Sequence, residues 1–243
     1  MNIITRTKNS FKYRVLGITD TLLPDLTSLL DRIPTDFGGS CSLQKAYVMA
    51  WLIRRFKLQS TVDIGVYRGR SLFPQALAHR DYTKGVVYAV DPWSSAEARE
   101  KDNPELFEQI EAWADATDFD GIYKDVKKMA EEFGPHCVIV RKPSSEAVEY
   151  FKDRNISFDM VHIDGNHDRD KALSDVELYA PLLRPGGFVI MDDISWESVR
   201  PAYDLCASLF ELVYERVDVG YSVFRDSKNN GSLQRELAYY ISF

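Results

Sequence analysis

Three aspartates follow two apolar stretches that have the composition of buried β-strands. Asp164 ends the stretch 158–164, and Asp192 and Asp193 end the stretch 188–193. If these strands are neighbours in a parallel sheet, their carboxyl ends meet at one edge and the three carboxylates lie together. Such carboxylates repel, and at least one would stay protonated unless a cation compensates them. We therefore expect a hard divalent ion, Mg²⁺ first, with Mn²⁺ or Ca²⁺ as substitutes. The alternative is that Asp192 and Asp193 cap the helix that follows.

His167 stands three residues after Asp164, in the polar segment DGNHD (164–168). Imidazole titrates near neutral pH and suits the removal of a proton from a hydroxyl group. A lone histidine is usually structural, but this one lies in a polar loop at the ligand edge, so His167 is a candidate catalytic base. His162 lies inside the apolar stretch and is interpreted as a packed core histidine.

A second candidate site lies at DIGVYRGRS (63–71), which follows one predicted strand and opens a helix. Glycines there permit a tight turn and close approach of the backbone to a ligand. The spacing differs from the GxGxxG of dinucleotide-binding loops, and Asp63 at its head suits a cationic group better than a pyrophosphate. Asp91 ends the next strand, where a carboxylate accepts hydrogen bonds from a ribose diol. Trp93 either flanks the bound base or packs in the core.

Short apolar stretches alternate with amphipathic ones through the middle of the chain. Strands are expected near 61–64, 86–91, 137–141, 158–164 and 188–193, and helices near 42–56, 71–79, 144–153, 171–183 and 199–210. This alternation predicts a parallel sheet with helices on both faces. The segments 211–217 and 221–226, separated by a short turn, predict a terminal hairpin. Ligands of such sheets bind at the carboxyl ends of the strands, where both candidate sites fall.

Four motifs, DIGVYRGRS, AVDPW, FDMVHIDGNHD and LLRPGGFVIMDDI, together resemble the class I S-adenosylmethionine-dependent methyltransferases. The most similar branch is that of the macrocin O-methyltransferase-like enzymes and their relatives acting on sugars and natural products. The resemblance covers about residues 42–226. It implies an α/β, doubly wound, Rossmann-like methyltransferase fold, with a mostly parallel seven-stranded sheet and a C-terminal antiparallel hairpin strand.

The resemblance also implies roles for individual residues. The cofactor-binding residues are expected to be Asp63, Gly65, Gly69, Ser71, Asp91, Trp93 and Ser145. Asp91 would hold the ribose of S-adenosylmethionine, and Ser145 would contact the adenine edge unless it caps a helix. Metal-dependent members of the family place ligands where this chain has Asp164, Asp192 and Asp193. Some sugar O-methyltransferases of the branch have a histidine base at the offset of His167.

The composition excludes several classes of function. With 243 residues, 45% of them hydrophobic and 28% charged, the chain is an ordinary globular protein. Its 30 basic and 37 acidic residues give a net charge of −7, which argues against general affinity for nucleic acid or anionic membranes. Three widely spaced cysteines without a CxxC pair fit a reducing cytoplasm. The first residues lack the apolar stretch of a secretory signal, so we expect none, and no apolar run reaches the roughly 20 residues that a membrane span needs.

We expect three parts along the chain. Residues 1–41 form a cap or oligomer segment with a short helix near 22–32, residues 42–226 form the methyltransferase domain, and residues 227–243 form a tail that docks on the body or on a second subunit. Residues 93–135 make a charged insertion longer than a plain crossover needs. Because the insertion leaves from the carboxyl end of a strand, on the ligand side, we interpret it as a lid or a substrate wall. The alternative is a surface excursion or an oligomer contact.

The sequence thus predicts an S-adenosylmethionine-dependent methyltransferase, with Mg²⁺-dependent O-methylation of a sugar or natural-product hydroxyl as the first hypothesis. The expected partners are a small-molecule or glycan acceptor and further copies of the chain. One alternative is a metal-independent class I methyltransferase acting on another small molecule or a protein. A nucleotide-linked oxidoreductase and a non-catalytic cofactor-binding module are the others. Sensitivity to a chelator separates the first two hypotheses.

Overall fold

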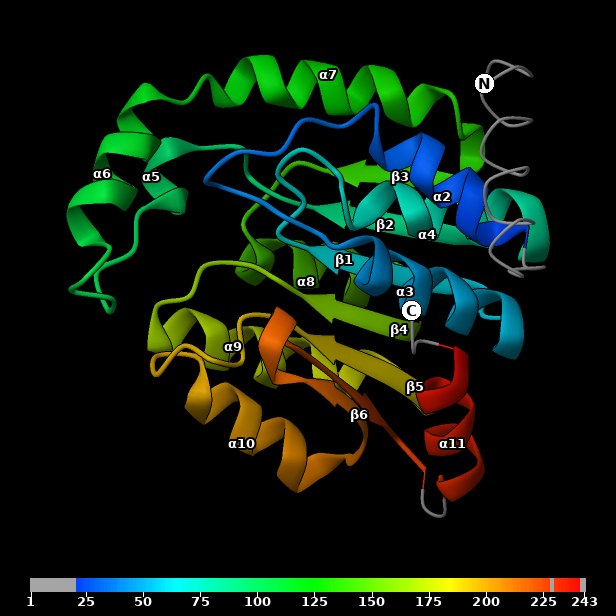
Figure 1. Cartoon of the computed structure of the whole chain (residues 1–243). Coiled ribbons are helices and arrows are strands. Elements are labelled where there is room, and N and C mark those ends of the chain that lie inside the picture. The colour runs from blue at the N-terminus through cyan, green and yellow to red at the C-terminus, as the bar shows by residue number, and fades with distance from the viewer. Residues whose placement is uncertain (1–20, 228–229, 241–243) are drawn as a thin grey trace.

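The computed structural model describes residues 21–227 and 230–240. At its centre is a seven-stranded sheet of order β3-β2-β1-β4-β5-β7-β6 (Figure 1). The strands are β1 (Ser60–Ile64), β2 (Val86–Val90), β3 (Cys137–Val140), β4 (Phe158–Ile163), β5 (Leu183–Met191), β6 (Glu211–Arg216) and β7 (Tyr221–Arg225). Strands β1 to β5 are parallel, and β7 runs antiparallel to both β5 and β6. The predicted parallel sheet with a terminal antiparallel hairpin is therefore confirmed.

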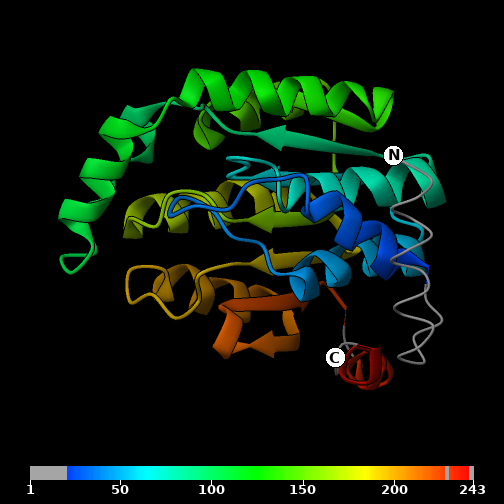
Figure 2. The same ribbon diagram turned by 45° about the horizontal axis from the view of Figure 1, so that its top comes forward.

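Helices cover both faces of this sheet (Figures 1 and 2). One hydrophobic cluster lies under α2 (Leu22–Leu30), α3 (Leu43–Phe56), α4 (Leu72–Ala78), α7 (Phe119–Glu131) and α11 (Gly231–Tyr240). The other lies under α8 (Ser144–Asp153), α9 (Arg169–Tyr179) and α10 (Arg200–Leu209). Because both faces are covered, every residue of β1 is buried, as expected for a central parallel strand.

Helix α3 has clear signals at both ends. The Ser42 side chain accepts a hydrogen bond from the backbone N–H of Lys45 at 3.0 Å, and Lys57 ends the helix in the left-handed conformation. The chain then enters β1 almost at once, at the amino edge of the sheet. The first turn of α3 therefore lies near the carboxyl edge, where the parallel strands end.

Strand β5 begins earlier than predicted. The segment Arg184-Pro185-Gly186-Gly187 was expected to separate a helix from a strand at 188, but the strand starts at Leu183. The reason is pairing on both sides: Leu183 pairs with Phe158 of β4 ahead of a register shift, and just after β7 the Gly186 N–H donates to Asp226 O at 2.9 Å and the Asp226 N–H donates to Gly187 O at 3.0 Å.

The insertion between β2 and β3 contains α5 (Ser95–Ala98), α6 (Phe107–Ala116) and α7. Helix α7 packs against β3, whereas α5 and α6 stand at the end toward which the arrowheads of the parallel strands point (Figures 1 and 2). At the two ends of the described chain, α2 packs on α3 and α11 packs on β6. The proposed domain boundaries stay a prediction, and residues 1–20 and 241–243 lie outside the described part. Among residues 21–227 and 230–240, no helix has the length and apolar character needed to cross a bilayer.

Candidate active site

A cavity of about 560 Å³ lies at the carboxyl edge of the sheet. Its wall is built from the ends of four parallel strands, the first turns of α8 and α9, and the insertion. The sequence-predicted residues on this wall are Gly65, Ser71, Asp91, Ser145, Asp164, His167, Asp192 and Asp193. Asp63, Gly69 and Trp93 are not on it. The structure therefore brings most of the two candidate sites to one cavity.

Asp91 organises the cofactor loop. One carboxylate oxygen accepts the backbone N–H groups of Val66 and Tyr67, at 3.0 and 2.9 Å, and the other accepts the N–H of Trp93 at 2.6 Å. Burial raises the pKa of Asp91, and the three backbone donors oppose that effect. A carboxylate offers about four acceptor positions, so Asp91 can still accept from a ligand hydroxyl in the cavity.

Gly65 joins the cofactor loop to the carboxylate cluster. Its φ of 82° lies in the left-handed region, and a Cβ there would lie 1.8 Å from the backbone oxygen of Asp164. No other residue permits this approach. The loop after β1 is thereby held against the end of β4, so that the two sites adjoin.

Three predicted cofactor residues lie behind the wall instead. The fully buried Asp63 accepts from Ser71 Oγ at 2.8 Å and lies 2.5 Å from His162 Nδ1, so it ties α4 to β4. The Trp93 side chain is 2% exposed, and its Nε1 donates to the backbone oxygen of Tyr67 at 2.8 Å, which agrees with the packing alternative. Gly69 has a φ of 85° and serves the turn. These three residues therefore support the residues that line the cavity without lining it themselves.

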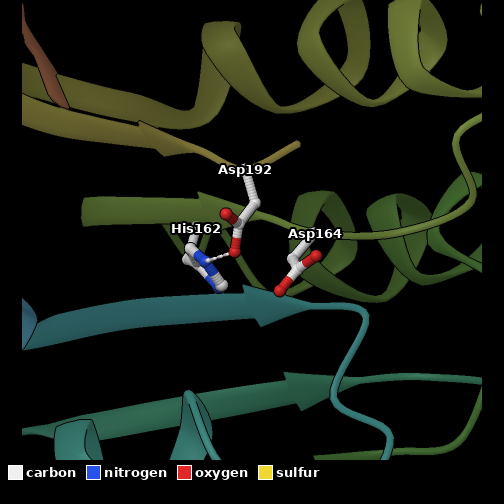
Figure 3. A group of neighbouring side chains, drawn as sticks. All are labelled: His162, Asp164 and Asp192. Atoms are coloured by element: carbon white, nitrogen blue, oxygen red, sulfur yellow. Dashed lines mark ion pairs between the residues drawn. The ribbon is translucent and has the colours of Figure 1, made fainter. Parts of the chain in front are cut away.

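The carboxylates at the strand ends fall into two overlapping groups. Donor atoms of His162, Asp164 and Asp192 lie within 4.8 Å of one another, and so do those of Asp164, His167 and Asp193. Figure 3 shows the first group, in which His162 Nε2 lies 3.6 Å from Asp192 Oδ2. Asp164 belongs to both groups, whereas Asp192 is buried and Asp193 is partly exposed. The three aspartates are thus at one edge but do not converge on a single point.

Lys45 of α3 enters the first group and was not foreseen. Its side chain is 4% exposed, its Nζ lies 3.4 Å from Asp164 Oδ2, and it forms a closer ion pair with Asp192 Oδ2. Burial lowers the pKa of Lys45, but the negative charge of Asp164 and its neighbours outweighs this effect and the pKa ends above its ordinary value. Lys45 is therefore an ammonium ion held between two carboxylates.

This contact bears on the expected Mg²⁺ site. Carboxylate oxygens are the ligands that Mg²⁺ prefers. However, the ammonium of Lys45 lies against two of the three predicted ligands, Asp164 and Asp192, and the third, Asp193, belongs to the other group. In this arrangement the three aspartates do not fit a shared divalent site.

His167 is held from both sides. Its Nδ1 lies 2.7 Å from Glu100 Oε1, which also accepts the His167 backbone N–H at 3.1 Å. A carboxylate can only accept, so Nδ1 carries the hydrogen. Nε2 lies 2.9 Å from Asp193 Oδ2, without the alignment of a hydrogen bond, and the Trp196 ring packs 4.6 Å from the imidazole. Burial lowers the pKa of His167, but Asp193 and Glu100 outweigh burial and raise it well above its ordinary value.

The insertion is fastened to the loop that carries His167. The Asn166 side chain donates to the backbone oxygens of Glu97 and Arg99, at 3.0 and 2.8 Å. Asp168 accepts the backbone N–H groups of Lys101 and Asp102, at 2.7 and 2.9 Å. These bonds and the Glu100 contact hold the segment 97–102 at the site, where Glu97, Ala98 and Glu100 line the cavity. The role of the whole insertion stays a prediction.

Asp175 of α9 also lines the cavity and yields a prediction on stability. Burial raises its pKa from 3.8 to about 6, although Ser144 opposes the effect by hydrogen bonding. Because the folded state holds this proton more tightly, wild-type stability should fall as pH rises from about 4 to about 6, by up to about 3 kcal/mol. Asp175→Asn should remove that fall, so that the variant is the more stable protein at pH 7.

Urea denaturation at pH 4 and pH 7 measures this effect, with Asp153→Asn on the exposed end of α8 as the matched control. Parallel pH profiles for the wild type and Asp175→Asn would contradict the prediction.

A family model described as "Methyltransferase domain" matches residues 62–194, more than half of the chain. The chain therefore belongs to this methyltransferase family, and the resemblance to class I methyltransferases is confirmed. The match favours this class over the oxidoreductase alternative. A comparison with curated protein sequences gave no match.

Solved structures share the fold, among them two that are described as methyltransferases. Cofactor-bound Rv0187 from MTB is 13% identical, with a TM-score of 0.56 over 94% of this chain and 100% of that one. An O-methyltransferase from Bacillus cereus in complex with SAH is 13% identical, with a TM-score of 0.55 over 90% and 97%. The calicheamicin methyltransferase CalS11 is 17% identical, with a TM-score of 0.59 over 84% and 91%. At these identities the likeness establishes the fold.

Proposed function

We propose that this methyltransferase transfers the methyl group of S-adenosylmethionine to a hydroxyl group of a small molecule. The acceptor class that we favour is a sugar or another natural product. The observation that carries the proposal is the junction at Gly65, which places the loop held by Asp91 directly against Asp164 and hence beside His167. A cofactor bound along the loop would present its sulfonium to an acceptor that lies over the second group of side chains.

The choice of cofactor is supported by the wall of the cavity and by related structures. Gly65, Ser71, Asp91 and Ser145 remain available to a nucleoside-containing ligand. Two structures with the same fold were solved with SAH, one from Bacillus cereus and one from Podospora anserina. In our proposal Asp91 accepts from the ribose, and the first turn of α8, with Ser145, faces the adenine.

The proposed chemistry uses His167 as the proton acceptor. Between Glu100 and Asp193 the raised pKa keeps His167 protonated, so it becomes a base only when the acceptor displaces Asp193. With that carboxylate gone the pKa falls, Nε2 gives its proton to solvent, and its lone pair faces the acceptor hydroxyl while Glu100 fixes Nδ1–H. The proton passes from the hydroxyl to Nε2, and the oxygen attacks the methyl carbon in line with the sulfonium. The carbon–sulfur bond then breaks, leaving the methyl ether and S-adenosylhomocysteine. Glu100 stabilises the imidazolium that forms, as a buried carboxylate does in other His–acid pairs.

Two forms of the proposal differ in the cation that balances the carboxylates. In the first, Mg²⁺ binds Asp164, Asp192 and Asp193, as the sequence predicts. In the second, transfer needs no metal. The position of Lys45 favours the second form.

The acceptor class is supported by two observations. CalS11 is described as a TDP-rhamnose 3'-O-methyltransferase. In this chain the cavity wall contains Trp196, whose ring packs against His167, and, from the insertion, Trp113, whose ring packs against Tyr67. Both offer flat surfaces to a sugar or aromatic ring. We also propose a cytoplasmic location, supported by three cysteines that are buried and unpaired. A homo-oligomer stays a prediction.

Calorimetry with S-adenosylhomocysteine tests the cofactor proposal. Asp91→Asn should bind about 10- to 100-fold more weakly than the wild type, because a hydrogen bond to a charged group contributes about 1.5–3 kcal/mol. Asp153→Asn should bind like the wild type. Binding of NAD in place of S-adenosylhomocysteine, or equal affinities for wild type and Asp91→Asn, would refute the proposed cofactor site.

A further inference from the structure

The position of Lys45 is determined by the fold. It lies in the first turn of α3, where its backbone N–H donates to the capping Ser42, and every residue from 45 to 53 is buried. Lysine is seldom buried in proteins unless its charge is paired. Here the long stem passes through the core, and the ammonium emerges among the side chains that end β4 and β5.

The partners of Lys45 are the residues that a divalent ion would need. Its Nζ lies 3.4 Å from Asp164 Oδ2 and contacts Asp192 Oδ2 more closely. A metal ion bridging these two carboxylates would lie beside the ammonium in a poorly solvated space, and like charges repel strongly there. Two cations therefore cannot share this position, and the fold already supplies one of them.

The second group also brings three possible metal ligands together, but its carboxylates already face side chains of the protein. It contains Asp164, which is shared with Lys45, and Asp193, whose Oδ2 lies 2.9 Å from His167 Nε2. Asp192, the predicted third ligand, belongs only to the first group. The ammonium and the imidazole thus face the same three carboxylates to which the sequence assigned Mg²⁺.

We infer that Lys45 is the resident cation of the active site: its ammonium holds Asp164 and Asp192 in the place of a divalent metal, so that methyl transfer proceeds without one. The catalytic part of this inference rests on the proposed function. Whether Lys45 or a metal ion lies between Asp164 and Asp192 can be tested without it. The inference also makes a gain-of-function prediction. Removal of the ammonium leaves two adjacent carboxylates, which is the start of a divalent-ion site.

Titration of the full chain with Mn²⁺, followed by electron paramagnetic resonance of the free ion, tests the inference without any activity assay. The wild type should leave Mn²⁺ free in solution. Lys45→Met should bind one Mn²⁺ at least about tenfold more tightly than the wild type, and adding Asp192→Asn to Lys45→Met should abolish that gain. Lys152→Met, which removes an exposed lysine of α8, is the matched control and should behave like the wild type.

A wild-type protein that binds one Mn²⁺ and loses it in Asp192→Asn would overturn the inference, as would a folded Lys45→Met that gains no Mn²⁺ binding. If Lys45→Met does not fold, the wild-type titration still decides, because wild-type binding that depends on Asp192 overturns the inference and its absence supports it. Calorimetry with S-adenosylhomocysteine on the same wild-type sample keeps the two proposals apart. If the wild type does not bind S-adenosylhomocysteine, the proposed function is refuted, but the Mn²⁺ result still decides which cation occupies the site.

Discussion

Replacement of His167 by alanine is expected to lower kcat by about 10²- to 10⁴-fold, the usual contribution of a general base. The physical reason is that His167 is the one histidine among the described residues that lines the cavity wall, where it lies beside Asp164 and Asp193. The affinity for S-adenosylhomocysteine should stay near that of the wild type, because the cofactor loop is organised by Asp91 instead. Transfer of labelled methyl at saturating cofactor measures kcat, and calorimetry measures the affinity.

Glu100→Gln is the informative companion to this variant. A glutamine oxygen still accepts from Nδ1, so the orientation of His167 is kept, but the negative charge that stabilises the imidazolium is lost. Its kcat should fall less than that of His167→Ala. A loss of less than about tenfold for His167→Ala between pH 6 and pH 9 would show that another group removes the proton.

Replacement of Lys45 by methionine is expected to lower the free energy of unfolding by about 3–5 kcal/mol at pH 7, the cost of breaking a buried ion pair from one side. Methionine keeps most of the apolar stem, so the loss reports on the charge. Two carboxylates, Asp164 and Asp192, would then face each other without a cation. Urea denaturation of the wild type and the variant measures the difference.

The double variant Lys45→Met/Asp192→Asn separates charge from packing. It should recover a large part of the lost stability, because it removes one of the two unpaired charges. Lys152→Met, which breaks only an exposed pair with Glu149, should change stability by less than about 1 kcal/mol. A loss of that small size for Lys45→Met would mean that the Lys45 ion pair contributes nothing of consequence to the site.

The fold could be predicted because its signals are local. Short apolar strands alternate with amphipathic helices along the chain, and a hairpin follows them. Few architectures have this pattern, and the observed order β3-β2-β1-β4-β5-β7-β6 is one that fits it. The early start of β5 could not be predicted, because Arg184-Pro185-Gly186-Gly187 has the composition of a turn. The pairing that makes it a strand comes from Phe158 of β4 on one side and from Asp226, just after β7, on the other.

The candidate site was predictable where its residues end strands, and less so elsewhere. Asp91, Asp164 and His167 follow apolar runs, so the topology alone brings them to one edge. Lys45 is separated from Asp164 by 119 residues, and only the folded chain makes them neighbours. The sequence does hold one signal for it: Lys45 stands four residues before Met49 on the apolar stripe of α3, where a charged residue needs a partner.

Glu100 had no such signal, because it is one of many acidic residues in the insertion. Only its contact with His167 distinguishes it. Asp63 shows the opposite case. Its position at the head of the cofactor loop suggested contact with the ligand, but its side chain turns to Ser71 and His162 behind the wall. Spacing along the sequence predicts which segment reaches a site, but not which way each side chain points.

Transfer of a labelled methyl group from S-adenosylmethionine into fractionated small molecules and glycans, with and without EDTA, tests the central claim most directly. We predict label on a hydroxyl of one acceptor fraction, retained in EDTA and strongly reduced in Asp91→Asn. Label that EDTA abolishes and Mg²⁺ restores would keep the methyltransferase and contradict the role assigned to Lys45. No transfer to any fraction, by a protein that binds S-adenosylhomocysteine, would contradict the claim itself.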